Sequence, residues 1–259
     1  MIKNKKIVLT GASSGIGFEV MKRLAAEPSN TILAVARRVD KLEGFAANVI
    51  PFSCDVSNKE GIDKLFEKAE EVFDCIDLLY ANAGVPYYEK FDYADWDRIE
   101  GIFNLNTISP IYTYSKYVNH LNGRKGHLVY TISAIGEMAM PGFALYSASK
   151  FGLNGFQQAI RLEKPETLTL TCIYPVSTKT NFAKVAGNGE EVDLPSPVQA
   201  VEEVADAAVK GIEQGKESIY PCKVYLPSKV IMAICPPARK AYWNQEKGKF
   251  LRHLERQKK

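Results

Sequence analysis

Short apolar segments alternate with longer segments of helical periodicity along most of this 259-residue chain. The apolar segments read as strands, and several are continuously apolar, as strands covered on both faces are. Six such segments are KKIVLT (5–10), TILAVA (31–36), NVIPFS (48–53), CIDLLYA (75–81), GHLVYTIS (126–133) and LTLTCIY (168–174). Helical periodicity covers 15–27, 58–73, 94–121 and 144–164. Repeated strand-then-helix units predict an α/β fold, a Rossmann-like doubly wound parallel sheet with helices on both faces.

The length, charge and hydropathy of the chain limit its domain organisation, its ligands and its location in the cell. A chain of this length fits one α/β domain, which we expect to cover 1–222, followed by a basic extension over 223–259. A formal net charge of +3 is too small to indicate nucleic-acid binding. The N-terminal apolar run is too short for a signal peptide, and none reaches the about 20 residues of a membrane span. We therefore expect a cytoplasmic protein.

The five cysteines and three histidines are scattered along the chain. An odd number of widely spaced cysteines indicates reduced thiols, not a disulfide framework. No pattern typical of metal ligands is present in the sequence, so no metal site is predicted.

A glycine-rich segment, TGASSGIG (10–17), joins the first predicted strand to the first predicted helix. Its glycines permit a tight turn and a close backbone approach, and the helix N-terminus offers free N–H groups to a pyrophosphate. The spacing is G-x-x-x-G-x-G and not the familiar G-x-G-x-x-G. A plain structural turn is the alternative, but the position in a βαβ unit favours nucleotide binding. The predicted contacts are Gly11, Ser13, Ser14, Gly15, Ile16 and Gly17.

Two arginines follow the second predicted strand, where an NAD-binding protein would place a carboxylate for the ribose hydroxyl. Arg37 and Arg38 would suit the additional phosphate of NADP, which we expect in preference to NAD. The alternative is that they only solvate the strand end. After the third strand, Asp55 and Val56 are further predicted cofactor contacts. Asp55 would accept from the adenine amino group or cap the helix beginning near Asn58.

The segment LYSASK (145–150) places Tyr146 and Lys150 four residues apart, one turn apart on the same face of a helix. Alone, this pair is equally consistent with the polar surface of a helix. Ser133 lies thirteen residues before Tyr146, beyond the fifth strand, and Asn106 lies further upstream in the preceding predicted helix. Singly, the serine fits a strand end and the asparagine fits a cap before Pro110.

Together with TGASSGIG, CDV (54–56) and ANAG (81–84), these residues resemble the short-chain dehydrogenase/reductase family over about Ile7 to Tyr220. The resemblance implies about seven strands in the order 3-2-1-4-5-6-7. It also implies hydride transfer between NADP(H) and a carbonyl or secondary alcohol, and a homodimer or homotetramer formed through the helices that hold Asn106 and Tyr146.

The resemblance assigns four catalytic residues. Tyr146 is the proton donor in reduction and the base in oxidation, and a nearby ammonium would lower its pKa from about 10. Lys150 supplies that charge and binds the nicotinamide ribose. Ser133 holds the substrate oxygen. Asn106, with Asn104 as the weaker candidate, would hold a water that links Lys150 to solvent.

The same resemblance extends to further cofactor contacts. Asn82, Ala83 and Gly84 would close the adenine pocket. After the sixth strand, Pro175 and Thr180 match the family, whereas Val176 replaces the usual glycine. We expect backbone contacts from Val176 and Thr178 to the nicotinamide carboxamide to persist.

The substrate pocket is expected to involve 134–138, 85–88 and the loop over 182–194, part of a long loop at 183–197. Its apolar and aromatic residues fit a ketone, a 3-oxoacyl group or a steroid-like alcohol equally well. Two rival functions are a non-catalytic dinucleotide sensor and a membrane-peripheral lipid-metabolising reductase.

The segment 239–259 contains eight Lys or Arg against two Glu, a net charge of +6. As a helix, it would place Trp243, Phe250 and Leu254 near one face. Weak contact with an anionic membrane is one interpretation. The favoured one is an arm that covers the subunit's own substrate cleft or a neighbouring subunit.

Overall fold

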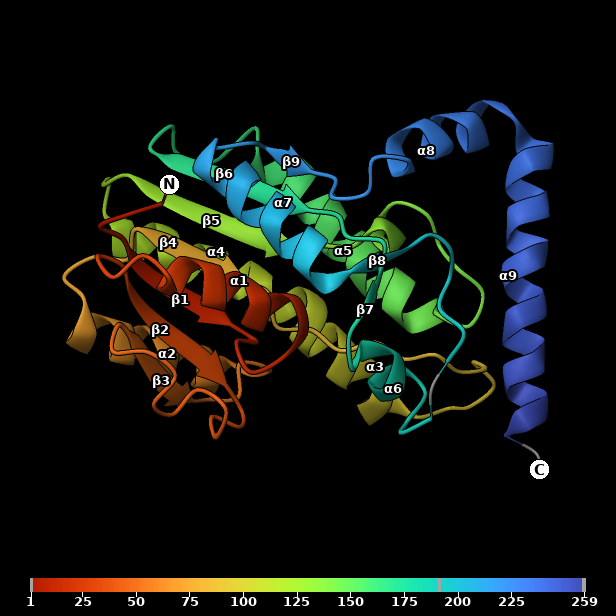
Figure 1. The fold of residues 1–259 in the computed structure, drawn as a ribbon, viewed down its shortest axis with the longest axis horizontal. Coiled ribbons are helices and arrows are strands. Elements are labelled where there is room, and N and C mark those ends of the chain that lie inside the picture. The colour runs from red at the N-terminus through yellow and green to blue at the C-terminus, as the bar shows by residue number, and fades with distance from the viewer. Residues whose placement is uncertain (1, 191, 258–259) are drawn as a thin grey trace.

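Seven parallel strands form the main sheet of the computed structural model, which describes residues 2–190 and 192–257 (Figure 1). The spatial order is β3-β2-β1-β4-β5-β6-β9. The predicted order 3-2-1-4-5-6-7 is confirmed, with β9 as its seventh strand. The strands are β1 (Lys6–Thr10), β2 (Thr31–Ala36), β3 (Val49–Ser53), β4 (Leu78–Ala81), β5 (Gly126–Thr131), β6 (Leu168–Ile173) and β9 (Ser218–Ile219).

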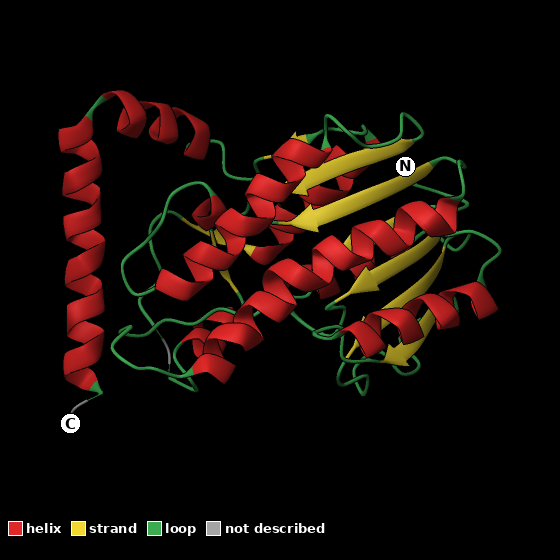
Figure 2. Ribbon diagram, turned by 180° about the vertical axis from the view of Figure 1, so that it is seen from behind, coloured by secondary structure: helices red, strands yellow, loops and turns green. Residues whose placement is uncertain are grey.

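Helices cover both faces of this sheet. On one face α1 (Gly15–Ala25) packs beside α7 (Val201–Glu213), and on the other lie α2 (Lys59–Val72), α4 (Ser109–Leu121) and α5 (Ala144–Ile160) (Figures 1 and 2). Successive side chains of a strand point to opposite faces, so Ile7 and Leu9 join the α1 and α7 core while Val8 joins the other. Because both faces are buried, the central strands are continuously apolar.

The single helix predicted over 94–121 is divided in the structure. It consists of α3 (Trp96–Phe103), a π-helical turn at Asn104–Ile108, and α4. Asp95 caps α3 by accepting from the Arg98 N–H at 2.9 Å. Pro110 lies in the first turn of α4, where its missing N–H removes a donor that an uninterrupted helix would need. The interruption places Asn106 inside the π-helical turn.

The segment predicted as a long loop over 183–197 is partly ordered into secondary structure. Its first residues belong to α6 (Phe182–Ala186). A second, two-stranded parallel sheet pairs β7 (Ser177–Lys179) with β8 (Val198–Ala200). This pairing holds the two ends of the segment 180–197 side by side. The sequence offered little signal for these strands, because each is only three residues long.

The chain ends in two helices, α8 (Tyr225–Ile234) and α9 (Pro236–Arg256), which project beside the main body (Figure 1). The expected C-terminal helix is present as α9. It packs on its own subunit: the Trp243 indole donates to the Ala139 carbonyl at 3.0 Å, and the Phe250 and Tyr88 ring centroids lie 5.2 Å apart. Within residues 2–190 and 192–257, the helices are too short or too polar to cross a membrane.

Candidate active site

A cavity of about 570 Å³ opens at the carboxyl ends of the central strands, within the usual range for small-molecule sites. Parallel strands present the turns that follow them at this edge, so the segments after β1, β4, β5 and β6 converge there. The predicted site residues that line the cavity are Gly11, Ser14, Gly15, Ile16, Asn82, Ala83, Gly84, Ser133, Tyr146, Lys150, Pro175, Val176, Thr178 and Thr180.

The glycine-rich segment after β1 takes a backbone path that requires glycine. Gly11 and Gly15 have φ values of +70° and +57°, which residues with a Cβ rarely adopt. At buried Gly17, a Cβ would lie 2.3 Å from the Gly11 carbonyl oxygen. These residues hold the start of α1 tightly against the turn after β1.

The N-terminus of α1 has unsatisfied backbone donors at the cavity. Ser14 precedes the helix in an extended conformation and makes no capping bond through its side chain. The first helical hydrogen bond runs from the Phe18 N–H to the Ser14 carbonyl at 3.3 Å. The N–H groups of Gly15, Ile16 and Gly17 therefore precede the helical ladder, as an anion site requires. This arrangement fits the pyrophosphate of a dinucleotide, and Ser13 lies just outside the cavity lining.

Asn82 links the ends of three strands. Its Nδ2 donates to the Thr10 carbonyl at 3.2 Å, and its Oδ1 accepts from the Thr131 hydroxyl at 3.0 Å. The Thr10 hydroxyl oxygen accepts from the N–H groups of Asn82 and Ala83, both at 3.1 Å. Thr10 and Thr131 were absent from the predicted site, although each is a polar residue that ends a buried strand. Their role is to fix the turn that carries Ala83 and Gly84.

The residues predicted to contact the adenosine part of the cofactor follow β2 and β3. Arg37 and Arg38 are exposed and lie outside the cavity lining. The turn after β1 is fastened beside them, because the Ala12 N–H donates to the Val35 carbonyl at 3.2 Å. Two exposed arginines thus follow the strand residue to which the glycine-rich segment is bonded.

Asp55 does not cap the helix that follows it. Its carboxylate accepts from the Ser57 N–H at 3.0 Å, whereas Asn58 caps α2 by accepting from the Gly61 N–H at 2.8 Å. Asp55 remains exposed and Val56 is buried. Of the two predicted roles of Asp55, helix capping is therefore excluded.

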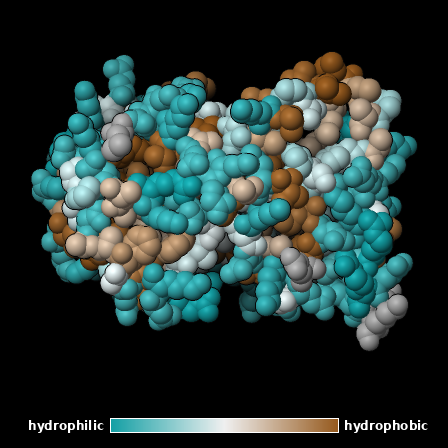
Figure 3. All heavy atoms as spheres, in the orientation of Figure 1, coloured by the Kyte–Doolittle hydropathy of each residue, from teal (hydrophilic) through white to brown (hydrophobic). Residues whose placement is uncertain are grey.

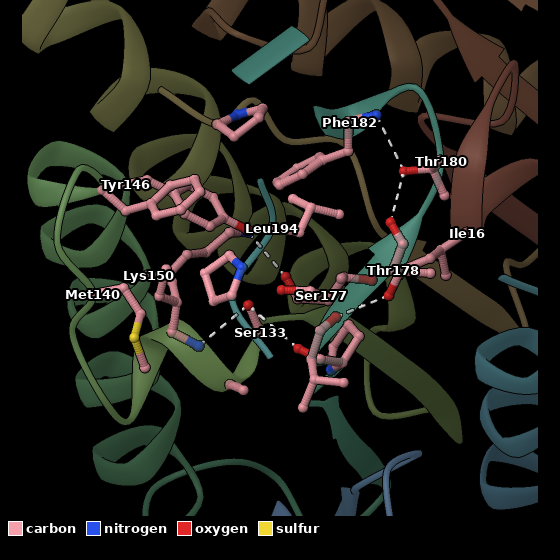
Figure 4. A pocket seen from close by; sticks show the side chains of 18 of the residues that line it. Ile16, Ser133, Met140, Tyr146, Lys150, Ser177, Thr178, Thr180, Phe182 and Leu194 are labelled. Carbon is pink, nitrogen blue, oxygen red and sulfur yellow. Dashed lines mark hydrogen bonds between the residues drawn. The ribbon is translucent and has the colours of Figure 1, made fainter. Parts of the chain in front are cut away.

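Ser133, Tyr146 and Lys150 surround the same part of the cavity (Figure 4). Tyr146 and Lys150 are buried on α5, and Tyr146 hydrogen-bonds Ser133. Ser133 has φ 116° and ψ 149°, a region that residues other than glycine seldom occupy and that costs about 1–3 kcal/mol. Its hydroxyl oxygen accepts from the Ile135 N–H at 3.2 Å and donates to the Pro175 carbonyl at 3.4 Å. These contacts hold the side chain toward Tyr146.

Burial governs the proton affinities of this group. It raises the pKa of Tyr146 well above its ordinary value, and the hydrogen bond with Ser133 only partly opposes this effect. Burial also lowers the pKa of Lys150 to about 8. In the protein alone, burial therefore outweighs any lowering of the Tyr146 pKa, and the expected lowering by Lys150 together with an oxidised nicotinamide stays a prediction for the complex. The Lys150 ammonium lies 6.0 Å from the centroid of the Tyr146 ring and donates to the Thr131 carbonyl at 3.0 Å.

Asn106 is fully buried behind the cavity, not in its lining. Its Oδ1 accepts from the Val85 N–H, and its Nδ2 donates to the Val85 carbonyl, both at 2.9 Å. The Nδ2 also donates to the Ser149 hydroxyl at 3.1 Å. A Cβ at Gly84 would lie 3.1 Å from Asn106 Oδ1 and 3.5 Å from Lys150 Nζ. The missing side chain of Gly84 therefore leaves a small space that both groups face.

The segment after β6 closes the cavity beside the glycine-rich turn. The Thr178 hydroxyl donates to the Val176 carbonyl at 2.9 Å, and the Thr180 hydroxyl oxygen accepts from the Phe182 N–H at 3.1 Å. Thr180 also approaches Gly15, where a Cβ would lie 3.6 Å from Thr180 Cγ2. Val176 lines the cavity together with Pro175 and Thr178.

The remainder of the cavity is predominantly apolar. Its apolar lining includes Pro86, Ile135, Met138, Met140, Phe143, Phe182, Val185 and Leu194. Tyr87 and Tyr88, expected in this pocket, lie outside its lining. The Arg98 guanidinium covers the Tyr87 ring at 4.0 Å, and Tyr88 packs against Phe250 and His253.

One wall of the cavity was missed by sequence reasoning. Tyr225, Ser228, Lys229 and Met232 of α8 contribute to the lining. The Tyr225 hydroxyl donates to the Ala134 carbonyl at 3.2 Å and to Glu137 at 3.0 Å, and Lys229 pairs with Glu137 at 2.7 Å. These contacts tie α8 to the segment after Ser133. The i, i+3, i+4 and i+7 spacing of 225, 228, 229 and 232 was the available signal.

Metal ligands do not gather in the part of the chain that the structure describes. Among those residues, no group of three or more His, Cys, Asp or Glu side chains is placed to hold a metal ion.

Comparison with known sequences identifies relatives over most of the chain. A sequence model described as short chain dehydrogenase matches residues 5–191. The glycine betaine reductase ATRR of Emericella nidulans is 31% identical over 227 residues, 82% of this chain but only 18% of that protein. The 3-ketodihydrosphingosine reductase of Dictyostelium discoideum is 28% identical over 284 residues, 94% of this chain and 81% of that protein.

Solved structures share the fold. A short-chain dehydrogenase/reductase from Burkholderia phymatum in complex with NAD has a TM-score of 0.79 at 20% identity and covers 92% of this chain and 97% of its own. A short-chain dehydrogenase from Sphingobium yanoikuyae in complex with NADPH has a TM-score of 0.75 at 24% identity, covering 85% and 88%.

Proposed function

Because the chain belongs to the short-chain dehydrogenase/reductase family, we propose that it transfers a hydride between NADP(H) and the carbonyl or secondary alcohol of an apolar small molecule. A bound nicotinamide dinucleotide supplies or accepts the hydride. The observation that carries the proposal is the convergence of Ser133, Tyr146 and Lys150 on the cavity that the glycine-rich segment also lines.

Tyr146 moves the proton in this proposal. In reduction its hydroxyl donates a proton to the substrate oxygen as negative charge develops there, and in oxidation the phenolate takes the proton back. Ser133 donates a hydrogen bond to the same oxygen, and its strained backbone keeps the hydroxyl aimed at Tyr146. Lys150 in its ammonium form stabilises the phenolate by opposite charge.

A path for the proton from solvent is supported by the space at Gly84. Asn106 Oδ1 and Lys150 Nζ both face it, and the Asn106 side chain is held rigidly by its bonds to Val85 and Ser149. We assign to this space a water that Asn106 positions and that returns protons to Lys150. Asn106 is thus a positioning residue that does not itself touch substrate.

The preference for NADP rests on the two arginines after β2. Arg37 and Arg38 are exposed beside the turn after β1, where a 2′-phosphate would receive bidentate hydrogen bonds from a guanidinium group. Asn82, Ala83 and Gly84 line the cavity. Asp55, just after β3, would accept a hydrogen bond from the adenine amino group.

An apolar substrate is supported by the cavity lining of Met, Phe, Ile, Leu and Pro side chains. A long-chain ketone, a 3-oxoacyl thioester and a steroid ketone share the required chemistry, a carbonyl on an apolar body. One relative is named 3-ketodihydrosphingosine reductase, and that name denotes a ketone substrate.

A homodimer or homotetramer through α4 and α5 completes the proposal. Phe151 on α5 and Ile108 beside the start of α4 expose 43% and 54% of their surface, which association would cover. Light scattering on the purified chain measures this directly, and a monomer at micromolar concentration would contradict it.

The test is turnover of a panel of ketones, 3-oxoacyl thioesters and steroid ketones, followed by the absorbance of NADPH. We expect oxidation of NADPH with at least one apolar carbonyl compound. Tight binding of NADPH without turnover of any member of the panel would instead establish a dinucleotide sensor.

A further inference from the structure

The outer face of α8 is an exposed apolar surface. Leu226, Val230, Ile231 and Ile234 expose 42, 58, 54 and 78% of their surface. Pro236 and Pro237 are also exposed and continue the apolar surface at the start of α9. Figure 3 shows hydrophobic residues gathered over α8. We call the exposed residues Leu226, Val230, Ile231, Ile234, Pro236 and Pro237 the α8 surface.

The opposite face of the same helix is a wall of the cavity. Ser228, Lys229 and Met232 line the cavity from α8, and Tyr225 anchors the helix to the segment after Ser133. A single helix thus separates the interior of the cavity from the α8 surface. Side chains on one side contact the space for an apolar substrate, while side chains on the other are available to an apolar environment.

Basic residues flank the α8 surface at both ends. Lys223 precedes α8, and Arg239 and Lys240 lie in the first turns of α9, past the corner between the two helices (Figure 1). Over 223–257 there are eight Lys or Arg and two Glu, although Lys229 and Arg256 pair with Glu137 and Asp193 outside this segment. Of the two Glu within the segment, Glu246 is buried and paired with Lys249 at 2.9 Å, and Glu255 lies near the far end of α9. An exposed apolar helix face beside cationic side chains is typical of an interfacial membrane helix.

We propose that the α8 surface docks on an anionic lipid bilayer, with Leu226, Val230, Ile231 and Ile234 entering the headgroup region and Lys223, Arg239 and Lys240 contacting lipid phosphates. The charge decides between a bilayer and a second copy of the chain. Two copies joined through this surface would bring two positively charged segments together, whereas anionic lipids neutralise each of them.

The proposed apolar contact with the membrane lies on α8 and not on 239–259, where membrane contact was the less favoured interpretation. In α9 the aromatic residues face the subunit: Trp243 bonds Ala139, and Phe250 packs on Tyr88. The outward side of α9 bears Lys247, Arg252 and other charged groups. Docking of α8 would bring the cavity wall to the bilayer surface, so an apolar substrate would reach the site from lipid. This consequence for substrate rests on the proposed function, whereas the docking itself does not.

The experiment is sedimentation of the full chain with vesicles of phosphatidylcholine and phosphatidylserine, compared with vesicles of phosphatidylcholine alone. We expect binding to the anionic vesicles that weakens at high salt. The double variant Ile231→Asp/Ile234→Asp should lose about tenfold or more in partition coefficient. Lys223→Glu/Lys240→Glu should lose the salt-dependent part of binding while keeping the apolar contact.

The matched control is Leu162→Asp. Leu162 is 89% exposed but precedes β6, at the edge of the sheet opposite the cavity, so its variant should bind vesicles as the unaltered chain does. Circular dichroism melting confirms that each variant is folded.

Absence of vesicle binding at low salt overturns the proposal, as does equal loss in the Leu162→Asp control. If the α8 double variant only converts an oligomer to a smaller species by light scattering, a second copy covers this surface instead. Vesicle binding is measured without turnover, so a failure of the proposed enzymatic activity leaves this result intact.

Discussion

Tyr146, near the start of α5, hydrogen-bonds Ser133, which lies beyond the end of β5. The two side chains are held in a cavity that excludes most water from the phenol, which is only 6% exposed. Their pairing is set by the packing of α5 against the turn after Ser133, where Asn154 donates to the Gly136 carbonyl at 3.0 Å.

Removal of the Tyr146 hydroxyl should abolish proton transfer with little effect on the fold. We expect Tyr146→Phe to lower kcat by about 10²- to 10⁴-fold, the usual contribution of a general acid. NADPH affinity, measured by fluorescence titration, should change little because the ring still packs between Phe143 and Phe182. Tyr114→Phe on α4, outside the cavity lining, is the control and should retain activity. Normal turnover in Tyr146→Phe would refute the assigned role.

The buried Lys150 ammonium should cost the protein stability. Because its folded pKa of about 8 lies below the ordinary 10.5, folding disfavours the charged form, and the penalty is fully present below pH 8. Stability should rise as the pH increases from about 8 to 10.5, where the unfolded chain binds the additional proton. We expect Lys150→Met to increase the free energy of unfolding at pH 7 by about 1–2 kcal/mol, after the lost hydrogen bond to Thr131 is deducted.

Denaturant unfolding across this pH range checks the Lys150 prediction. The stability difference between Lys150→Met and the unaltered chain should shrink as the pH approaches 10.5, while turnover is lost at every pH. A difference that is constant with pH would show that Lys150 keeps its ordinary pKa in the folded protein.

The space at Gly84 offers a test of the proton path. A methyl group there would lie 3.1 Å from Asn106 Oδ1 and 3.5 Å from Lys150 Nζ, so it would displace a water between them. We expect Gly84→Ala to lower kcat about tenfold and to alter its pH profile, because proton return becomes slow. Gly101→Ala, where a Cβ meets nothing within 4 Å, is the control. It should leave the pH profile intact and slightly stabilise α3. An unchanged profile in Gly84→Ala would argue against the relay.

The cofactor preference should depend on Arg37. We expect Arg37→Asp to weaken NADPH binding by about tenfold to hundredfold and to strengthen NADH binding, because the carboxylate repels a 2′-phosphate and accepts from a ribose hydroxyl. Isothermal titration with both dinucleotides measures the ratio. Lys68→Asp, on the surface of α2, controls for the change in net charge. Equal effects of the two substitutions on the NADPH to NADH ratio would remove the arginine argument.

Much of the fold follows from local sequence patterns. The alternation of apolar strands and amphipathic helices predicts the parallel sheet, and its order is confirmed with β9 in the last place. The break within 94–121 was harder to predict, because Asn104–Ile108 is flanked by residues that continue the helical periodicity. The strands β7 and β8 are three residues each and depend on pairing across the segment 180–197.

The candidate site divides in the same way. Helical spacing pairs Tyr146 with Lys150 on one face of α5, whereas Ser133 was predicted from the resemblance to the short-chain dehydrogenase/reductase family. The contribution of α8 was not predictable from spacing to these residues, since it arrives at the cavity from 225–232, far along the chain. Tyr87 and Tyr88, predicted in the pocket, lie outside its lining, where the Arg98 guanidinium covers Tyr87 and Phe250 packs on Tyr88.

The sequence by itself determined the sheet, the glycine-rich turn and the identities of the polar residues at the carboxyl edge, because these depend on period, backbone freedom and local spacing. Only the tertiary structure decided the electrostatics of the site. Burial by segments distant in sequence raises the Tyr146 pKa and lowers that of Lys150, and the four-residue spacing of the two residues indicates neither effect. The tertiary structure also decided that α8 forms a wall of the cavity with one face and an apolar surface with the other. Desolvation and exposure depend on which segments meet in space, and no local pattern specifies that.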